Sequence, residues 1–476
     1  MIRRKVLLLN LPGSQIYIRD YYCSKVSKAK YLYHPVDLLM MSGTLSGRHE
    51  IRVIDGMLDG WTAFEVIRAF RSFQPEVVVF LTGVVSFRED LDFIAELKRI
   101  HDCVAVASGE LFLDNGSATL RLMPSIDGVI MDFTGTDILD LIDRLEAPGT
   151  FLPGPVIPNV IYRSGDSVIG TGLSAACGQE FELAIPRHDF FANDRYRYPF
   201  VRQFPFATIL TDFGCPFNCD FCAINRLGFK KRTVDNVIRE LDFIKALGFK
   251  DLYFDDQTFG ADRKRTERLL EAMIERKYRM GFICFTRADV VDRDMLKLMR
   301  RAGCHTVVFG VEAVGDESLK CAKKELSLAT VREAIGWCRM LQIRTVGTFI
   351  VGLPGMTEAE AARVGDFAVE LGLDFASFNV PAPRPGTGLR RQALDSGWIT
   401  GDLTEMDQSG SYAVMGNEFM SADAVLRYRT LASRRFYFRF EYIYQRLAGI
   451  RTWYELKTHI QEGFDILSPT RFSQRH

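Results

Sequence analysis

The sequence Phe206-Ala-Thr-Ile-Leu210, followed closely by Cys215-Pro-Phe-Asn-Cys219-Asp-Phe-Cys222, decides the fold and the chemistry of this chain. Three thiolates with C-x3-C-x2-C spacing can hold three irons of a four-iron, four-sulfur cluster, and the fourth iron then has no protein ligand. The alternative is three cysteines buried by chance in a strand-to-loop turn, because free cysteine is often a small core residue. The tight clustering, the turn residues Gly214 and Pro216, and the scattered positions of the other seven cysteines favour the cluster.

Length and composition indicate a globular protein with more than one domain. A chain of 476 residues exceeds what one hydrophobic core usually serves. Hydrophobic residues make up 47% and charged residues 25%, which is an ordinary globular composition. Sixty basic residues balance sixty acidic ones and no basic run stands out, so nucleic acid is not expected as a partner.

The first ten residues, Met1–Asn10, place basic residues before leucines as a signal peptide does. The apolar run breaks at Asn10-Leu-Pro-Gly13, which is too early for a signal peptide and fits a buried first strand. Later apolar runs such as Val77–Thr82 have strand length, so no transmembrane segment is expected. Ten cysteines without an export signal predict a cytoplasmic, reducing location, which an exposed iron–sulfur cluster also requires.

Residues 1–145 alternate short apolar strands with helix-like segments, which predicts an α/β domain with a doubly wound, Rossmann-like parallel sheet. The expected strands are Lys5–Asn10, Ile51–Asp55, Glu76–Thr82, Val104–Ser108 and Gly128–Asp132. Several of these strands end in glycine, serine or threonine. In open parallel sheets ligands bind beyond the carboxyl ends of the strands, where small residues let the backbone approach a cofactor. Any single glycine there can equally serve only a tight turn.

Residues 146–205 contain prolines, glycines and an aromatic stretch, Phe190–Tyr198, and are expected to form an ordered connector. Residues 206–390 then show six strands, each followed by a helix except the last, which predicts a partial TIM-like (β/α)6 barrel with its site at the carboxyl ends of the strands. The cysteine triplet follows the first of these strands. Residues 391–476 are expected to be a helical, aromatic C-terminal region. The expected strands are Phe206–Leu210, Asp251–Phe254, Phe282–Phe285, Thr306–Phe309, Arg344–Val351 and Phe375–Val380.

Over nearly its whole length the chain resembles the radical S-adenosylmethionine (SAM) superfamily, and more narrowly its members with an N-terminal cobalamin-binding domain. The resemblance rests on the triplet and on motifs at successive strand ends, including Phe254-Asp-Asp-Gln-Thr-Phe259, Thr286-Arg-Ala-Asp289, Gly310-Val-Glu312 and Pro383-Arg-Pro-Gly-Thr387. It implies that Cys215, Cys219 and Cys222 bind a [4Fe-4S] cluster whose fourth iron binds SAM. It further implies SAM or substrate contacts by Phe221, Asp255, Asp256, Arg287, Glu312 and Gly352.

The N-terminal domain departs from the histidine-binding type of cobalamin domain. Where that type carries Asp-x-His-x-x-Gly after the first strand, this chain reads Asn10-Leu-Pro-Gly-Ser-Gln. His34 and His49 are expected at the surface or in helix caps, so the resemblance implies cobalamin bound without a protein histidine ligand. A degenerate domain without cofactor is the alternative. The residues expected beside the corrin and its tail are Thr82, Gly83, Ser86, Gly109, Glu110, Thr134 and Gly135.

The resemblance implies reductive cleavage of SAM and, with cobalamin, methylation of an unactivated carbon in a small-molecule or lipid-like substrate. Flavodoxin or ferredoxin would supply the electron. Radical cyclisation, rearrangement or oxidation without methyl transfer is an alternative, and so is a non-catalytic iron–sulfur electron carrier or sensor. The remaining cysteines show no second cluster spacing. The aromatic C-terminal region is interpreted as a helical interface against the barrel or as a cap over its mouth.

Overall fold

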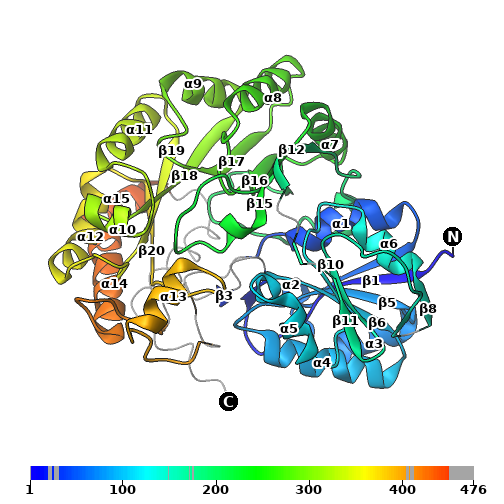
Figure 1. Ribbon diagram of the computed structural model, residues 1–476. Coiled ribbons are helices and arrows are strands. Elements are labelled where there is room, and N and C mark those ends of the chain that lie inside the picture. Colours follow the sequence, from blue (N-terminus) through cyan, green and yellow to red (C-terminus); the bar gives the residue numbers. More distant parts are fainter. Residues whose placement is uncertain are drawn as a thin grey trace.

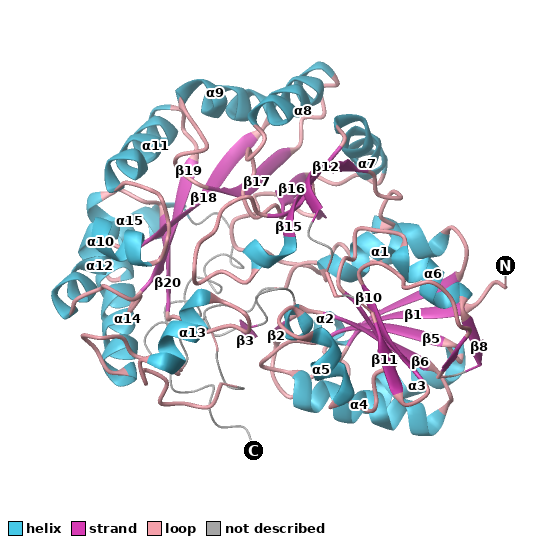
Figure 2. Cartoon of the chain, viewed as in Figure 1, coloured by secondary structure: helices cyan, strands magenta, loops and turns pink. Residues whose placement is uncertain are grey.

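Two α/β units lie side by side in the chain (Figure 1). The computed structural model describes residues 2–19, 24–25, 32–147, 149–170, 172–173, 176–403, 407 and 412–449. Each unit has strands at its centre and helices around them (Figure 2). No helix in this part of the chain has both the length and the apolar character to cross a bilayer.

The N-terminal unit is the predicted doubly wound sheet. Its parallel strands lie in the spatial order β4-β1-β5-β6-β7, and helices α1 and α6 cover one face while α3, α4 and α5 cover the other (Figure 1). The strands are β1 (Lys5–Asn10), β4 (Glu50–Asp55), β5 (Val77–Leu81), β6 (Val104–Ser108) and β7 (Gly128–Ile130). The helices are α1 (Val36–Ser46), α2 (Gly56–Asp59), α3 (Ala63–Phe73), α4 (Phe87–Ile100), α5 (Gly116–Arg121) and α6 (Asp137–Asp143). All five residues of β5 are buried, because helices cover both faces of the sheet.

The expected connector, residues 146–205, does not form one separate segment. Its first part contributes β10 (Val160–Ser164) and β11 (Ser167–Ile169), an antiparallel hairpin that extends the N-terminal sheet beyond β7. Short pairs also form from β2 (Tyr17–Ile18) with β3 (Ser24–Lys25) and from β8 (Leu145–Ala147) with β9 (Thr150–Phe151). The N-terminal sheet therefore reaches past residue 145, because the hairpin pairs with a sheet edge that the linear pattern does not reveal.

The second unit is the predicted partial barrel. Its six strands lie parallel in chain order, and its first and last strands stay at opposite edges, so the barrel is open. The strands are β13 (Phe206–Ile209), β16 (Asp251–Phe254), β17 (Gly281–Thr286), β18 (Cys304–Glu312), β19 (Arg344–Ile350) and β20 (Phe375–Asn379). Helices α7 (Val234–Ala246), α8 (Arg263–Glu275), α9 (Arg293–Ala302), α11 (Leu328–Met340) and α12 (Glu358–Glu370) follow one another around the sheet (Figure 1).

Two parts of the second unit are additions to the barrel. A small sheet is inserted around the loop that carries Cys215, Cys219 and Cys222, called the cysteine loop below. Its strands are β12 (Ala176–Phe181), β15 (Gly228–Arg232) and β14 (Asp212–Gly214). Helices α10 (Asp316–Cys321), α13 (Gly388–Asp395), α14 (Ala422–Tyr437) and α15 (Phe440–Gly449) complete the unit. Helix α14 packs on α12 and β20, where Phe436 contacts Phe378, so the C-terminal aromatics form an interface with the barrel. Residues 450–476 of the expected helical region lie outside the described residues.

His34 joins the two units. His34 and His49 are both buried and neither is a cap residue of α1, so the expectation that they lie at the surface or in helix caps is wrong. His34 is fully buried, with Nδ1 at 3.0 Å from the Thr208 hydroxyl of β13 and Nε2 at 2.8 Å from Asn193 Oδ1. Its ring lies 4.1 Å from the ring of Tyr196. Burial lowers the pKa of His34 to about 3, so its ring is neutral at pH 7. The pattern of the sequence could not show this burial, because the covering residues come from the connector and from β13.

Acidification should destabilise the chain through His34. The folded state holds this ring neutral down to about pH 3, whereas the unfolded ring takes up a proton below about pH 6.5. The contribution of His34 to the free energy of unfolding is therefore complete above pH 6.5, and it falls by about 1.4 kcal/mol per pH unit below that value. We expect His34→Gln to lose about 2 kcal/mol less than the wild type between pH 7 and pH 5, measured by urea unfolding. His101→Gln, at a partly exposed histidine, is the matched control, and an unchanged pH slope in His34→Gln would contradict this.

Candidate active site

The cysteine loop connects β14 and β15 of the small inserted sheet. The chain leaves β13, forms β14 and enters the loop at Cys215, whose backbone N–H donates to the Gly228 carbonyl at 2.9 Å. Inside the loop, Asn225 Nδ2 donates to the Cys219 carbonyl at 3.1 Å. The three cysteines are free thiols, Cys219 buried and the other two half-buried. The triplet thus follows the first barrel strand by way of β14, which the sequence did not predict.

Gly214 makes the entry to this loop possible. Its φ is +80°, a conformation that L side chains rarely adopt, and a Cβ there would clash with the Gly228 carbonyl oxygen. The same carbonyl accepts the hydrogen bond from Cys215. A side chain at position 214 would therefore separate β14 from β15 and displace the first cysteine.

We expect Gly214→Ala to weaken both folding and iron incorporation. Gly248 has a φ of +83° with nothing within 4 Å of the position that a Cβ would take, so Gly248→Ala carries the same backbone strain without the clash. The clash should make Gly214→Ala about 2 kcal/mol less stable than Gly248→Ala in urea unfolding. Iron content after anaerobic reconstitution should fall only in Gly214→Ala. Equal losses in the two variants would show that φ alone, and not the contact with Gly228, accounts for the glycine.

Asp256 holds the base of the cysteine loop. It is buried, and Oδ1 accepts hydrogen bonds from the backbone N–H groups of Thr211 at 2.5 Å and Asp212 at 3.1 Å. Its Oδ2 accepts from the Thr211 hydroxyl at 2.5 Å. Burial raises the pKa values of Asp256 and of the adjacent Asp212, and Arg265 opposes that effect. Both carboxylate oxygens of Asp256 accept hydrogen bonds from Thr211 or Asp212, and its predicted contact with SAM stays a prediction. Asp255, its neighbour, is half-buried.

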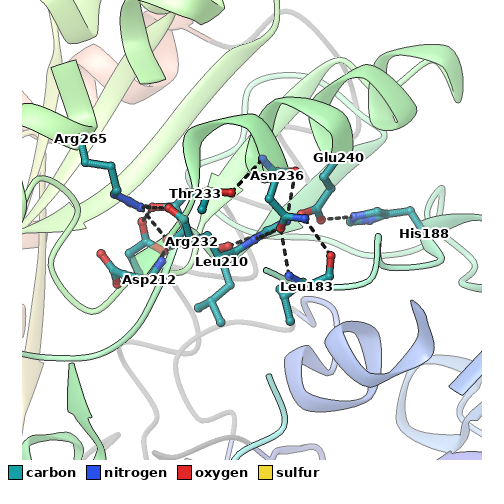
Figure 3. Close-up of polar contacts among 11 residues, drawn as sticks. Leu183, His188, Leu210, Asp212, Arg232, Thr233, Asn236, Glu240 and Arg265 are labelled. Carbon is teal, nitrogen blue, oxygen red and sulfur yellow. Dashed lines mark hydrogen bonds and ion pairs between the residues drawn. The ribbon is translucent and has the colours of Figure 1, made fainter. Parts of the chain in front are cut away.

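A second buried group, Arg232, binds Leu210, the residue just before this segment (Figure 3). Its guanidinium donates to the Leu210 carbonyl at 2.8 Å and to Glu240 at 2.5 Å, and Asn236 Oδ1 accepts from it at 2.6 Å. Glu240 also lies 2.7 Å from His188 Nε2. Burial alone would raise the pKa of Glu240, yet Arg232 and His188 hold it below its ordinary value. The network joins β15, α7, the connector and the end of β13.

Arg287, directly after β17, lies against Cys219, a contact that the sequence did not predict. Its guanidinium stacks over the Phe217 ring at 3.9 Å and places Nη1 3.7 Å from Cys219 Sγ. It forms a two-pronged pair with Asp289 at 3.0 and 2.7 Å and donates to the Glu325 carbonyl at 3.1 Å. Arg287 therefore brings positive charge to the Cys219 sulfur. Its predicted pairing with the SAM carboxylate stays a prediction.

Glu312 and Lys324 form a buried ion pair next to the cysteine loop. Lys324 Nζ lies 2.9 Å from Glu312 Oε1, and both side chains are almost fully buried. Glu312 sits at an irregularity in the β18–β19 pairing with a φ of +68°, an uncommon value for a residue other than glycine. Burial raises the pKa of Cys219, while Lys324 and Arg287 act in the opposite direction. The sequence predicted Glu312 but missed Lys324, because it follows α10 outside every strand-end motif.

Three further residues lie in different surroundings. Phe221 packs partly buried between two apolar clusters, one of which contains Val84 of the N-terminal unit. Gly352 has a φ of +99°, and a Cβ there would meet Val425 of α14 at 2.6 Å. The glycine thus allows α14 to approach the barrel, and its predicted adenine contact stays a prediction. The Thr258 hydroxyl, which was not predicted, lies 3.6 Å from Cys215 Sγ.

The predicted corrin residues line the carboxyl edge of the N-terminal sheet, and several already have protein partners. Ser86 donates to Asp90 at 2.6 Å and accepts from the buried Arg19 at 3.3 Å. Gly109 has a φ of +147°, and a Cβ there would clash with the Thr82 carbonyl. Thr134 donates to Asp132 at 2.6 Å.

Glu110 and Asp132 reach across to the barrel. Glu110 pairs with Arg384, which follows β20, and Asp132 pairs with Lys230 of β15. The Phe133 and Phe213 rings also meet at 5.3 Å. The edge predicted for cobalamin and the cysteine loop thus share one interface between the units. Thr82, Gly83 and Gly135 lie at the same edge, and their predicted roles stay predictions.

The donor set fits a four-iron cluster better than a single metal ion. Within the described ranges no three His, Cys, Asp or Glu side chains surround one ion. A cubane cluster does not need such convergence, because each cysteine binds a different iron. Three free thiols on one loop, with two cations beside Cys219, meet that requirement and leave one iron without a protein ligand.

Comparison with known proteins identifies similarity in the second unit, which carries the cysteine triplet. Residues 209–368 match the family model of the radical SAM superfamily. An uncharacterized methyltransferase of Pyrococcus horikoshii is 28% identical over 367 residues, which cover 76% of this chain and 78% of the relative. Hopanoid C-3 methylase of Methylococcus capsulatus is 24% identical over 357 residues, covering 71% of this chain and 64% of the relative.

A solved structure extends the likeness to the whole fold. It is the radical SAM methyltransferase TsrM of Kitasatospora setae with cobalamin and a [4Fe-4S] cluster bound, with a TM-score of 0.69 and 16% identity. The match covers 99% of this chain and 100% of TsrM. This chain is thus an α/β protein with a radical SAM domain. Its two units together have the fold of the cobalamin-dependent radical SAM enzymes.

Cys219→Ala should abolish cluster binding, because one iron loses its thiolate while the other two cysteines remain. The measurement is iron and sulfide content together with visible absorption after anaerobic reconstitution. Cys321→Ala is the control, since Cys321 is an exposed free thiol on α10 of the same domain. Full iron content in Cys219→Ala would contradict the assignment of the triplet.

Proposed function

We propose that this protein is a radical SAM enzyme that cleaves SAM reductively at a [4Fe-4S] cluster and, with cobalamin, methylates an unactivated carbon. The observation that carries the proposal is the cysteine loop at the carboxyl ends of the barrel strands, facing the carboxyl edge of the N-terminal sheet. Lys230 and Arg384 reach from the barrel side of this interface to Asp132 and Glu110. Methyltransferases among the relatives and a cobalamin-bound protein of the same fold support methyl transfer.

The cluster, when bound, supplies one low-potential electron to the sulfonium of SAM, a reaction that no side chain provides. The residues of the chain bind the iron and orient SAM. Cys215, Cys219 and Cys222 hold the iron, and Arg287 and Lys324 place positive charge beside Cys219, which favours the thiolate that binds metal. Asp255 and Glu312 are carboxylates suited to the SAM amino group, while apolar side chains around Phe221 exclude water.

Cobalamin in this proposal binds along the strand ends of β5, β6 and β7 without a protein histidine ligand. His34 supports that interpretation, since its ring is held between Thr208 and Asn193 and is not directed to this edge. Arg19 lies in the loop region after β1, where histidine-binding cobalamin domains carry their motif, and it donates to the carbonyls of Leu11 and Pro12 at 2.9 and 3.4 Å.

The substrate is proposed to be a small or lipid-like molecule, and the electron donor a small one-electron carrier such as flavodoxin or ferredoxin.

The test is anaerobic turnover of the reconstituted protein with SAM and dithionite. We expect 5′-deoxyadenosine from wild type and Cys321→Ala, and none from Cys219→Ala. Protein purified with hydroxocobalamin should carry stoichiometric cobalt. Absence of 5′-deoxyadenosine, together with a cluster spectrum that SAM does not change, would favour a non-catalytic iron–sulfur protein. Cobalt-free protein that still cleaves SAM would favour the degenerate N-terminal domain and remove the case for cobalamin-dependent methylation.

A further inference from the structure

A basic cavity opens at the end of the barrel opposite to the cysteine loop. Its volume is about 450 Å³, and it lies where β16, β17 and β18 begin, at Asp251, Gly281 and His305. The turns after α8 and α9 and the connector before β13 complete its wall. Six cationic side chains line it: Arg202, Lys250, Lys277, Arg279, Arg300 and Arg301. The sequence did not reveal this cluster, because the six come from four separate segments of an electrically balanced chain.

The Asp251 carboxylate in the cavity wall offsets only part of this positive charge, through its attraction to Arg202. Asp251 Oδ2 accepts hydrogen bonds from the backbone N–H groups of Arg202 at 2.8 Å and Gln203 at 3.3 Å. Its Oδ1 lies 3.0 Å from His305 Nε2 and accepts from the Leu252 N–H at 3.1 Å. The buried Asp251 carboxylate is therefore directed into the protein, where backbone groups and His305 engage it.

Two arginines at the two ends of α8 have carboxylate partners, and the six cavity cations do not. Arg263 and Arg276 of the α8 region pair with Asp292 and Asp242 at 2.8 and 2.9 Å. Within the described part of the chain, none of the six cavity cations forms an ion pair. Burial and the nearby Arg300 both lower the pKa of Arg202 although Asp251 opposes them, so Arg202 and Arg300, which both line the cavity, repel each other. A bound anion would relieve that repulsion.

Helix ends alone account for little of this charge. Helices α8 and α9 both end at the cavity, and each carboxyl end carries about half a negative charge. Two such ends balance about one of the six cations, which leaves a large local excess. The six cations are exposed and line one concavity without a carboxylate partner among the described residues.

We propose that this cavity binds a small polyanion that carries phosphate groups. A concave site of this volume is typical for small ligands, and arginine forks suit phosphate oxygens. An acidic electron-transfer protein is a poorer occupant, because the cavity opens at the starts of the strands whose far ends carry the cysteine site. The site is separate from the proposed catalytic centre, so its test does not depend on SAM chemistry.

The experiment is titration of the full-length protein with pyrophosphate, followed by isothermal calorimetry at low ionic strength. We expect saturable one-to-one binding in the wild type and at least about tenfold weaker binding in Arg279→Gln/Arg300→Gln, because two charge-assisted contacts are lost. Arg263→Gln/Arg276→Gln removes the same net charge from paired arginines outside the cavity and should bind within about twofold of wild type. The altered side chains are exposed, and circular dichroism confirms folding.

Several outcomes would overturn the proposal. One is the absence of saturable binding of pyrophosphate to the wild type, and another is equal weakening in both double variants. Binding of polyglutamate without binding of pyrophosphate would assign the cavity to an acidic protein surface instead. A parallel titration with ADP distinguishes the source of the phosphate, since tighter binding of ADP than of pyrophosphate supports a nucleotide and the reverse supports inorganic polyphosphate.

Discussion

The buried pair of Arg232 and Glu240 is the constraint on which the site depends. Both side chains are fully buried, so each charge requires the other and the hydrogen bonds around them. Removing one partner of such a pair typically costs about 3–5 kcal/mol, although the intact pair adds little net stability. The role of the pair is to hold neighbouring segments in place. Arg232 binds Leu210 at the end of the first barrel strand, and Glu240 binds His188 of the connector. The cysteine loop begins from this fixed segment, which Asp256 and Arg265 hold from the opposite side through Thr211.

The surroundings of the cysteines combine opposing effects. Burial raises the pKa of Cys215 and of Cys219, which disfavours the thiolates that bind iron. Arg287 and Lys324 lie close enough to Cys219 to oppose that effect, and each is in turn neutralised by a carboxylate, Asp289 or Glu312. The site therefore keeps its cations without leaving them unpaired in a buried environment. Metal binding and folding of the loop are expected to be coupled, because the thiols become ligands only as thiolates.

The interface between the units is part of the site. The ion pairs Glu110–Arg384 and Asp132–Lys230, the contact of His34 with Thr208 and the Phe133–Phe213 contact all cross it. Glu110, one of the residues that a family resemblance suggests for cobalamin, is therefore also a residue that holds the N-terminal sheet against the barrel. Ser86 and Thr134 are already engaged within their own unit, since both bind carboxylates there. Any cofactor at this edge would share it with contacts that define how the two units are oriented.

The sequence by itself determined the two α/β units, nearly every strand of both sheets and the cysteine triplet that we propose binds the cluster. Buried parallel strands show as apolar runs, and the cysteine spacing is local, so both signals lie within a few residues. Tertiary structure alone decided what surrounds the triplet. Lys324 beside Glu312, the internal engagement of Asp256, the burial of His34 and the hairpin β10–β11 on the first sheet join residues far apart in the chain. Hydrogen bonding and desolvation depend on which segments meet in space, and a linear pattern does not contain that information. The sequence did not predict the basic cavity for the same reason. Its positive charges are balanced by acidic residues in the overall composition, and they come together only where the starts of the strands lie side by side in the fold.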